Sequence, residues 1–152
     1  MATDNTATEA PRSSGDFLVR SIRETNELAA KLLPLLQKAG VVSLEGPLGA
    51  GKTHMVKATA RAMGITEEVT SPTFTLLQSY CSGEKRLHHS DWYRLDSEAE
   101  VRGLGLEDYY GEGLMLIEWG DKFPAVLPPG TLRIRIEPMP DETRRITVGS
   151  TA

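Results

Sequence analysis

Hydrophobic residues recur along the chain at two spacings, one typical of helices and the other typical of strands. Residues 25–38 predict a helix, because their leucines recur at helical spacing on one side, at Leu28, Leu32, Leu35 and Leu36. Thr25 is a candidate N-cap of this helix, and Gly40 is a candidate for its end. Pro34 lies inside the pattern and is expected to bend or split the helix, because proline has no amide N–H to donate.

Shorter hydrophobic runs predict strands. The compact runs at residues 41–44 and 114–117 predict two apolar strands, the first of them central in a sheet. Apolar and polar residues alternate at 132–137, which predicts a strand with one solvated face and favours an edge position for Arg133 and Arg135. Further strands are predicted at residues 17–19, 74–80, 86–91 and 145–148. The polar turn at 82–85 makes the strand at 86–91 return antiparallel to its predecessor.

Helices predicted at residues 25–38, 52–63 and 97–104 alternate with these strands, so the sequence predicts an α/β fold. We expect a central mixed, mainly parallel sheet, flanked by helices and by an antiparallel hairpin, in a single domain at residues 16–148. Residues 1–15 are rich in Ala, Thr and Ser and predict a disordered N-terminal tail. Residues 149–152 are expected to form a C-terminal tail.

Composition and charge narrow the class of protein. The 152 residues fit one domain, and their net charge of -4 disfavours tight direct binding of nucleic acid, because affinity for phosphates needs a basic surface. No apolar run approaches the roughly 20 residues that cross a bilayer, so no membrane partner is expected. Cys81 is the only cysteine, which excludes an intrachain disulfide and indicates a reducing, cytoplasmic compartment.

One motif indicates a specific chemistry. Residues 46–53 match the phosphate-binding pattern G-x-x-x-x-G-K-[ST] in full, after a predicted strand and at the start of a predicted helix. Glycines let the backbone wrap a phosphate closely, and the helix N-terminus adds partial positive charge. Lys52 is expected between the terminal phosphates, and Thr53 is expected to bind the Mg²⁺ that they hold. The candidate nucleotide-binding residues here are Gly46, Leu48, Gly49, Ala50, Gly51, Lys52, Thr53 and His54.

Two acidic residues at predicted strand ends complete the candidate catalytic set with Lys52. Glu118 follows the apolar run at 114–117 and is expected at the same sheet edge as the phosphate loop, where it would bind Mg²⁺ directly or through water. Asp91 could orient the attacking water or help to hold the metal. A solvated strand end for Glu118, and a helix or turn cap for Asp91, are the alternative structural interpretations.

Three other features carry weaker signals. Trp119 either packs in the core or covers the nucleotide site. The segment Ser71-Pro72-Thr73 follows the loop helix, where P-loop proteins often have a segment that senses the terminal phosphate, although the sequence alone favours an ordinary proline turn. The histidines predict no zinc site, because the adjacent His88 and His89 point to opposite faces of a strand.

Four separated motifs together resemble the TsaE (YjeE) family of small bacterial P-loop ATPases. They are the phosphate loop at 46–53, then Ser-Pro-Thr-Phe-Thr-Leu at 71–76, His-Ser-Asp-Trp-Tyr-Arg-Leu at 89–95 and Ile-Glu-Trp at 117–119. The first motif is shared by many NTPases, whereas the order and spacing of all four are specific. The resemblance covers residues 16–137, nearly the whole of the predicted domain.

The resemblance implies an ATPase that supports the synthesis of threonylcarbamoyladenosine (t6A) in tRNA without forming the modified base itself. It implies ATP and Mg²⁺ as ligands, docking on a heterodimer of TsaB and TsaD, and contact with tRNA only through that complex. By position, Thr25 and Thr73 match family residues near the nucleotide. Asp91 and Trp119 match positions that are important for hydrolysis, and Glu118 matches the Walker B-type acid.

A P-loop kinase for a small metabolite is the main alternative function. Such kinases usually close an arginine-bearing lid over the phosphates, and Arg94 and Arg102 are the only arginines between Asp91 and Glu118. A GTP switch is less expected, because the sequence has no Asn-Lys-x-Asp-like segment that would recognise guanine. A binding subunit for which nucleotide is only a conformational ligand stays open. With no positioned arginine finger evident, we expect slow hydrolysis by the isolated protein.

Overall fold

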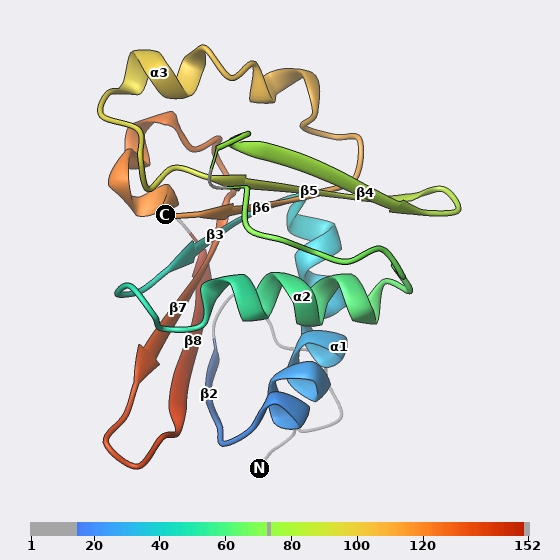
Figure 1. Cartoon of the computed structure of the whole chain (residues 1–152), viewed down its shortest axis with the longest axis vertical. Coiled ribbons are helices and arrows are strands. Elements are labelled where there is room, and N and C mark those ends of the chain that lie inside the picture. The colour runs from blue at the N-terminus through green and yellow to red at the C-terminus, as the bar shows by residue number, and fades with distance from the viewer. Residues whose placement is uncertain (1–14, 73, 151–152) are drawn as a thin grey trace.

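In the computed structural model, which describes residues 15–72 and 74–150, a seven-stranded sheet runs through the centre of the protein (Figure 1). Helices α1 and α2 cover one face of the sheet, and α3 with three short 3₁₀ helices covers the other. In chain order the elements are β2 (Gly15–Val19), α1 (Ile22–Ala39), β3 (Val41–Glu45), α2 (Lys52–Ala62), β4 (Leu77–Ser82), β5 (Lys85–Asp91), α3 (Glu98–Arg102), η1 (Leu106–Asp108), β6 (Leu114–Glu118), η2 (Gly120–Lys122), η3 (Pro124–Val126), β7 (Leu132–Pro138) and β8 (Arg144–Ser150).

The sheet is parallel at its centre and antiparallel at both edges, with the spatial order β2-β8-β7-β3-β6-β5-β4. Strand β3 pairs in parallel with β6 and β7, and β6 pairs in parallel with β5. Strands β2, β8 and β4 add antiparallel pairings, and β4 with β5 forms the predicted hairpin. The α/β class and the mixed sheet are therefore confirmed. The carboxyl ends of β3, β5 and β6 meet at one edge, where open α/β sheets bind their ligands.

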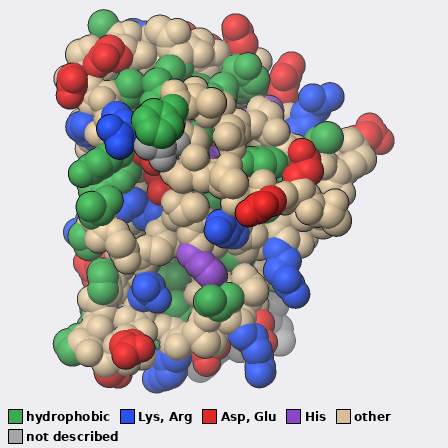
Figure 2. Space-filling view, viewed as in Figure 1, with side chains coloured by type: hydrophobic (Ala, Val, Ile, Leu, Met, Phe, Trp, Pro, Cys, Tyr) green, Lys and Arg blue, Asp and Glu red, His purple; other side chains and the backbone are tan. Residues whose placement is uncertain are grey.

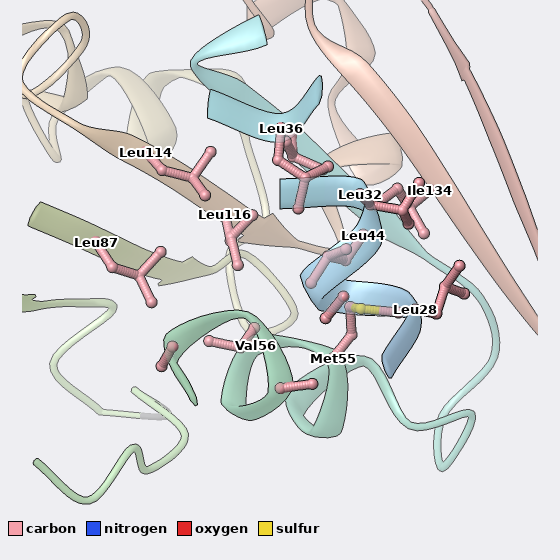
Figure 3. Packing of buried hydrophobic residues seen from close by; sticks show 14 of the residues in the cluster. Leu28, Leu32, Leu36, Leu44, Met55, Val56, Leu87, Leu114, Leu116 and Ile134 are labelled. Carbon is pink, nitrogen blue, oxygen red and sulfur yellow. The ribbon is translucent and has the colours of Figure 1, made fainter. Parts of the chain in front are cut away.

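The core between the helices and the sheet fixes the position of that edge. Residues at helical spacing on α1 and α2 pack against the buried face of β3, β5, β6 and β7 (Figure 3), and Leu32, Leu36 and Leu44 have no exposed surface. Burial of one such side chain stabilises the fold by roughly 1.5–3 kcal/mol. The start of α2, which carries the end of the phosphate loop, is therefore held against the sheet by packing along the rest of the helix.

Helix α1 differs in detail from its prediction. Its N-cap is Ser21, whose hydroxyl accepts the amide N–H of Glu24 at 3.1 Å, so the prediction of Thr25 as the cap is wrong. Thr25 lies one turn inside the helix, where its hydroxyl donates to the carbonyl of Ser21. Pro34 does not split the helix, because it lies on the exposed side, where water can bond the carbonyl that lacks its usual donor. The helix ends at Gly40 as predicted.

Several strands differ from their predicted limits or positions, because these depend on which strands pair, and no local sequence pattern predicts the pairing. The sheet begins at Gly15 and ends at Ser150, so it extends past the predicted domain limits of 16 and 148, and the rest of the predicted tails lies outside the described residues. The strand expected from residue 74 begins only at Leu77. Strand β7 lies between β3 and β8, so the edge position predicted for Arg133 and Arg135 is wrong. In the described ranges no helix is long and apolar enough to span a membrane.

Candidate functional site

The phosphate-binding motif forms a tight bend between β3 and α2. Gly46 has φ 143°, and a Cβ there would lie 2.3 Å from the carbonyl oxygen of Ile136, so only glycine fits. Gly51, at the start of α2, has φ 105° and packs beside the side chain of Arg144. Arg144 also donates from Nε to the carbonyl of Ala50 at 2.7 Å, which ties β8 to the bend. The backbone therefore adopts a strand–bend–helix path at the edge where the parallel strands end.

Lys52 is buried and points back into this bend. Its amine donates to the carbonyl oxygens of Gly46 at 2.7 Å and Pro47 at 2.9 Å, and it lies 4.1 Å from the centre of the Trp119 ring. Burial lowers the pKa of Lys52, and the nearby carboxylates, of which Glu118 acts most strongly, oppose that shift. Backbone carbonyls thus hold the Lys52 amine inside the bend, where an anion that binds there could take over these hydrogen bonds.

Glu118 reaches the bend from the end of β6. Its Oε2 accepts the hydroxyl of Thr53 at 2.8 Å, and the Nε2 of His89 lies 2.7 Å from the same oxygen. The carboxylate is almost fully buried, at 4% exposure. Thr53 and Glu118 are 65 residues apart in the chain, and the parallel pairing of β3 with β6 brings them together.

Asp91 lies beside Glu118, because the two residues are paired across β5 and β6. Its Oδ1 accepts the amide N–H of Tyr93 at 2.9 Å. Burial raises the pKa of Asp91; the Tyr93 hydrogen bond opposes this shift, and the negative charge of Glu118 adds to it. The Asp91 carboxylate therefore both caps a turn, through its hydrogen bond with Tyr93, and lies next to the candidate metal ligand Glu118.

Trp119 connects the site to the core. It is a non-glycine residue with φ 63°, a conformation that the tertiary structure must hold, and its amide donates to the carbonyl of Leu44 at 3.1 Å. Its ring covers the amine of Lys52, and the Tyr93 ring centre lies 5.0 Å away. The same side chain packs against the hydrophobic cluster on the α3 face of the sheet. Trp119 therefore packs against the core with part of its side chain and lines the candidate site with the rest, so each of its two interpretations is partly correct.

Two cavities flank the start of α2. The first, of about 430 Å³, brings together most of the predicted residues and is lined by Leu48, Gly49, Gly51, Lys52, Thr53, His54, Ser71, Asp91, Tyr93, Arg94, Glu118 and Trp119. The second, of about 380 Å³, contains the predicted Thr25 together with Arg20, Ser21 and Arg144. His54 lines both cavities, and its Nε2 is buried with no hydrogen-bond partner among the described residues. Thr73 lies outside the described residues.

The donors at this site fit Mg²⁺ in one specific way. Within the described ranges, no cluster of three or more His, Cys, Asp or Glu side chains could hold a metal ion by itself. Thr53 and Glu118 instead offer two adjacent oxygen donors that face the phosphate bend. Mg²⁺ is usually bound by one or two carboxylates together with phosphate and water oxygens, so this pair fits an ion that arrives with a nucleotide.

Three side chains at the site were not predicted as nucleotide-binding or catalytic residues, although Arg94 was considered as a lid arginine of the kinase alternative. Tyr93 and Arg94 line the first cavity, and His89 contacts Glu118. Strand alternation carried a signal for His89, because residues two apart on a strand share a face and Asp91 was already a candidate. Tyr93 and Arg94 follow β5 in a turn, where no periodicity indicates direction.

Comparisons with known proteins agree on one family. The sequence model described as "Threonylcarbamoyl adenosine biosynthesis protein TsaE" matches residues 19–146. Two proteins named tRNA threonylcarbamoyladenosine biosynthesis protein TsaE are similar to the chain. The one from Treponema pallidum is 42% identical over 85% of this chain and 96% of its own length. The one from Bacillus subtilis is 43% identical over 82% and 78%. A crystal structure of YdiB from Bacillus subtilis superposes with a TM-score of 0.73 at 32% identity, over 91% of this chain and 86% of that one.

Proposed function

Because the chain belongs to the TsaE family, we propose that it binds and slowly hydrolyses ATP with Mg²⁺ as an accessory protein of tRNA threonylcarbamoyladenosine (t6A) synthesis. The family is of the P-loop type and binds nucleotides. The observation that carries the proposal is the contact of 2.8 Å between Thr53 and Glu118 at the phosphate bend. A hydroxyl at the helix start and an acid from the neighbouring strand are the protein groups that P-loop NTPases use to hold Mg²⁺.

In this proposal the backbone N–H groups of Gly46 and of residues 48–51 bind the phosphates, and the amine of Lys52 leaves the carbonyls of Gly46 and Pro47 to pair with the terminal phosphates. Mg²⁺, when bound, neutralises charge on those phosphates. Thr53 and Glu118 hold the ion, and Asp91 orients the attacking water or assists with the metal. The base lies in the second cavity, beside Thr25 and His54, because that cavity adjoins Gly51 at the end of the bend.

The proposed partner is a TsaB–TsaD heterodimer, which the family resemblance implies, and tRNA is contacted only through that complex. Acidic and basic side chains are interspersed on the face that carries α2 and the phosphate bend (Figure 2), and the net charge is -4. Such a surface favours weak direct binding of tRNA, because counterion release requires clustered cations. We also propose a cytoplasmic location, because the proposed partner complex acts on tRNA.

The decisive experiment measures phosphate release from ATP and Mg²⁺ by the purified chain, with and without the heterodimer. We expect the isolated chain to hydrolyse ATP slowly. In the complex we expect hydrolysis to be at least roughly ten-fold faster, because a partner can complete a P-loop site. Transfer of phosphate to a metabolite, with no effect of the heterodimer, would instead favour the kinase alternative. Of the two candidate lid arginines, Arg102 pairs with Glu98 on α3, whereas Arg94 lines the first cavity. Only one of the several arginines that such a lid usually carries is therefore at the site.

Substitution of Glu118 by glutamine is expected to lower turnover by about 100-fold while nucleotide still binds. The amide keeps the size of the carboxylate and can still accept from Thr53, but it removes the negative charge that would attract Mg²⁺. Turnover is measured over a Mg²⁺ titration, and nucleotide affinity by calorimetry. Glu84→Gln, at an exposed carboxylate in the β4–β5 turn, is the control. Equal turnover and Mg²⁺ requirement in E118Q and the wild type would contradict the metal assignment.

Substitution of Asp91 by asparagine separates its two interpretations. Asparagine can still accept the Tyr93 amide through its side-chain oxygen, so the turn is retained while the charge is lost. If Asp91 orients water or metal, turnover falls by about 100-fold with nucleotide affinity nearly unchanged. Asp96→Asn, an exposed neighbour, controls for general effects. Normal turnover in D91N would leave Asp91 with a structural role only.

A further inference from the structure

A buried histidine that no part of the proposed mechanism uses touches the candidate metal ligand. His89 lies on β5 with 0% exposure, and its Nε2 is 2.7 Å from Oε2 of Glu118. That oxygen also accepts the hydroxyl of Thr53. A hydroxyl and a ring nitrogen from different elements therefore converge on one oxygen of the carboxylate. Among the described residues, none donates a hydrogen bond to the other oxygen, Oε1.

We propose that His89 is a positioning residue, whose Nε2–H fixes the Glu118 carboxylate in the orientation that binds Mg²⁺ beside Thr53. This inference rests on the proposed ATPase function. The Nδ1 of His89 is buried and has no partner among the described residues. The hydrogen-bond network assigns the proton to Nε2, because a buried N–H without an acceptor costs more than a bare lone pair, and a carboxylate can only accept.

The surroundings of His89 favour this role over simple packing. The residues on the same face of β5 and β6 that precede the polar end are apolar, namely Leu87, Leu114 and Leu116. A leucine at position 89 would continue that core and leave no unpartnered nitrogen, whereas a buried polar group is unfavourable unless it is hydrogen-bonded. Glu118 supplies the one hydrogen bond that the His89 side chain makes in the described part of the chain.

His88 provides an internal comparison, because it is equally buried on the opposite face of β5. Its Nδ1 lies 2.7 Å from the hydroxyl of Ser79, its Nε2 lies 3.4 Å from the carbonyl of Glu112, and its ring packs edge-on against Tyr109. Both of its nitrogens have partners, and none of them belongs to the candidate site. His88 is therefore the matched control for a buried histidine with a structural role.

The test uses the full chain and compares His89→Leu, which fills the space without a donor, with His89→Gln, whose amide nitrogen can donate from nearly the position of Nε2. Calorimetry measures ATP affinity with and without Mg²⁺, and kinetics give the Mg²⁺ concentration at half-maximal turnover. For H89L we expect that concentration to rise about ten-fold, with the metal-free affinity for ATP unchanged. H89Q is expected to restore it to within about three-fold of wild type, and H88Q is expected to leave it unchanged.

Two results would overturn the role of His89. The first is a normal Mg²⁺ requirement in H89L, and the second is equal impairment of H89L and H89Q, which indicates packing alone. Thermal unfolding monitors the fold of each variant, and His89→Asn, which is polar but too short to reach Glu118, replaces H89L if the leucine variant does not fold. A wild-type protein without Mg²⁺-dependent ATP binding would overturn the proposed function itself, and that outcome is read from the wild type before any variant.

Discussion

Replacement of Lys52 by alanine is expected to lower ATP turnover by about a thousand-fold and to weaken nucleotide binding as well. Two carbonyl oxygens fix the position of this amine inside the bend, and in the proposed mechanism it moves to the terminal phosphates. Loss of a preorganised charge at developing negative charge typically reduces rates by factors of this order. Phosphate release under single-turnover conditions and calorimetric titration with ATP measure the two effects separately.

Lys57→Ala is the matched control for K52A, because it removes an exposed lysine from the same helix. Its turnover should stay close to that of the wild type. A K52A protein that folds normally and hydrolyses ATP at the wild-type rate would refute the assignment of residues 46–53 as a phosphate-binding loop. The comparison of melting temperatures is part of the test, because alanine at position 52 also removes the amine from the carbonyls of Gly46 and Pro47, of which Pro47 still accepts the amide N–H of Ala50.

Replacement of Arg133 by alanine is expected to reduce the free energy of unfolding by about 3 kcal/mol. Glu45, the last residue of β3, is 2% exposed, and Arg133 binds it through two bonds, from Nε at 2.6 Å and from Nη2 at 2.7 Å. Without the guanidinium, the hydroxyl of Ser43, at 3.2 Å, is the one hydrogen-bond donor that the buried carboxylate keeps among the residues that the structure describes. The carboxyl of Asp121 is also close: burial raises its pKa, and the charge of Glu45 adds to the shift. Urea unfolding measures the loss.

Arg135 offers the control for this prediction, since it lies two residues along the same face of β7. It pairs with Glu137, and both side chains are substantially exposed, at 51% and 38%. R135A should therefore change the free energy of unfolding by no more than about 0.5 kcal/mol. In the double variant E45Q/R133A, part of the loss should be recovered, because an amide is less costly to bury than a carboxylate. The side chain of Arg133 is itself 45% exposed, so the prediction rests on the burial of Glu45 alone, and an R133A protein as stable as R135A would show that this pair contributes nothing.

Sequence patterns located the parts of the site that depend on local structure. The motif at 46–53 specifies its own bend, and the apolar run before Glu118 indicates a strand that ends in a carboxylate. Because the carboxyl ends of parallel strands meet at one edge, the approach of Glu118 to Thr53 followed from these two local facts. The structure likewise brings Asp91 next to Glu118.

The features that the sequence did not predict depend on which strands become neighbours. Arg133 was expected on a solvated edge because its strand alternates, but alternation reports only that one face is polar. The addition of β8 and β2 beyond β7 makes the strand internal, and the buried Glu45 then gives Arg133 a partner. The N-cap of α1 was misassigned because Ser21 and Thr25 are one turn apart and both residue types favour caps. The contact between His89 and Glu118 required the β5–β6 register, which no pattern within one strand contains.

The two tryptophans contact the same hydrophobic cluster, but only Trp119 also lines the first cavity, which gives the protein an intrinsic fluorescence probe of that cavity. Trp92 is fully enclosed, with Phe123 as its aromatic neighbour and its ring centre 6.4 Å away. The ring of Trp119 lies against the amine of Lys52, which moves to the terminal phosphates in the proposed mechanism. We therefore expect the emission of the indole at position 119 to change when the loop is occupied, and no dye has to be attached.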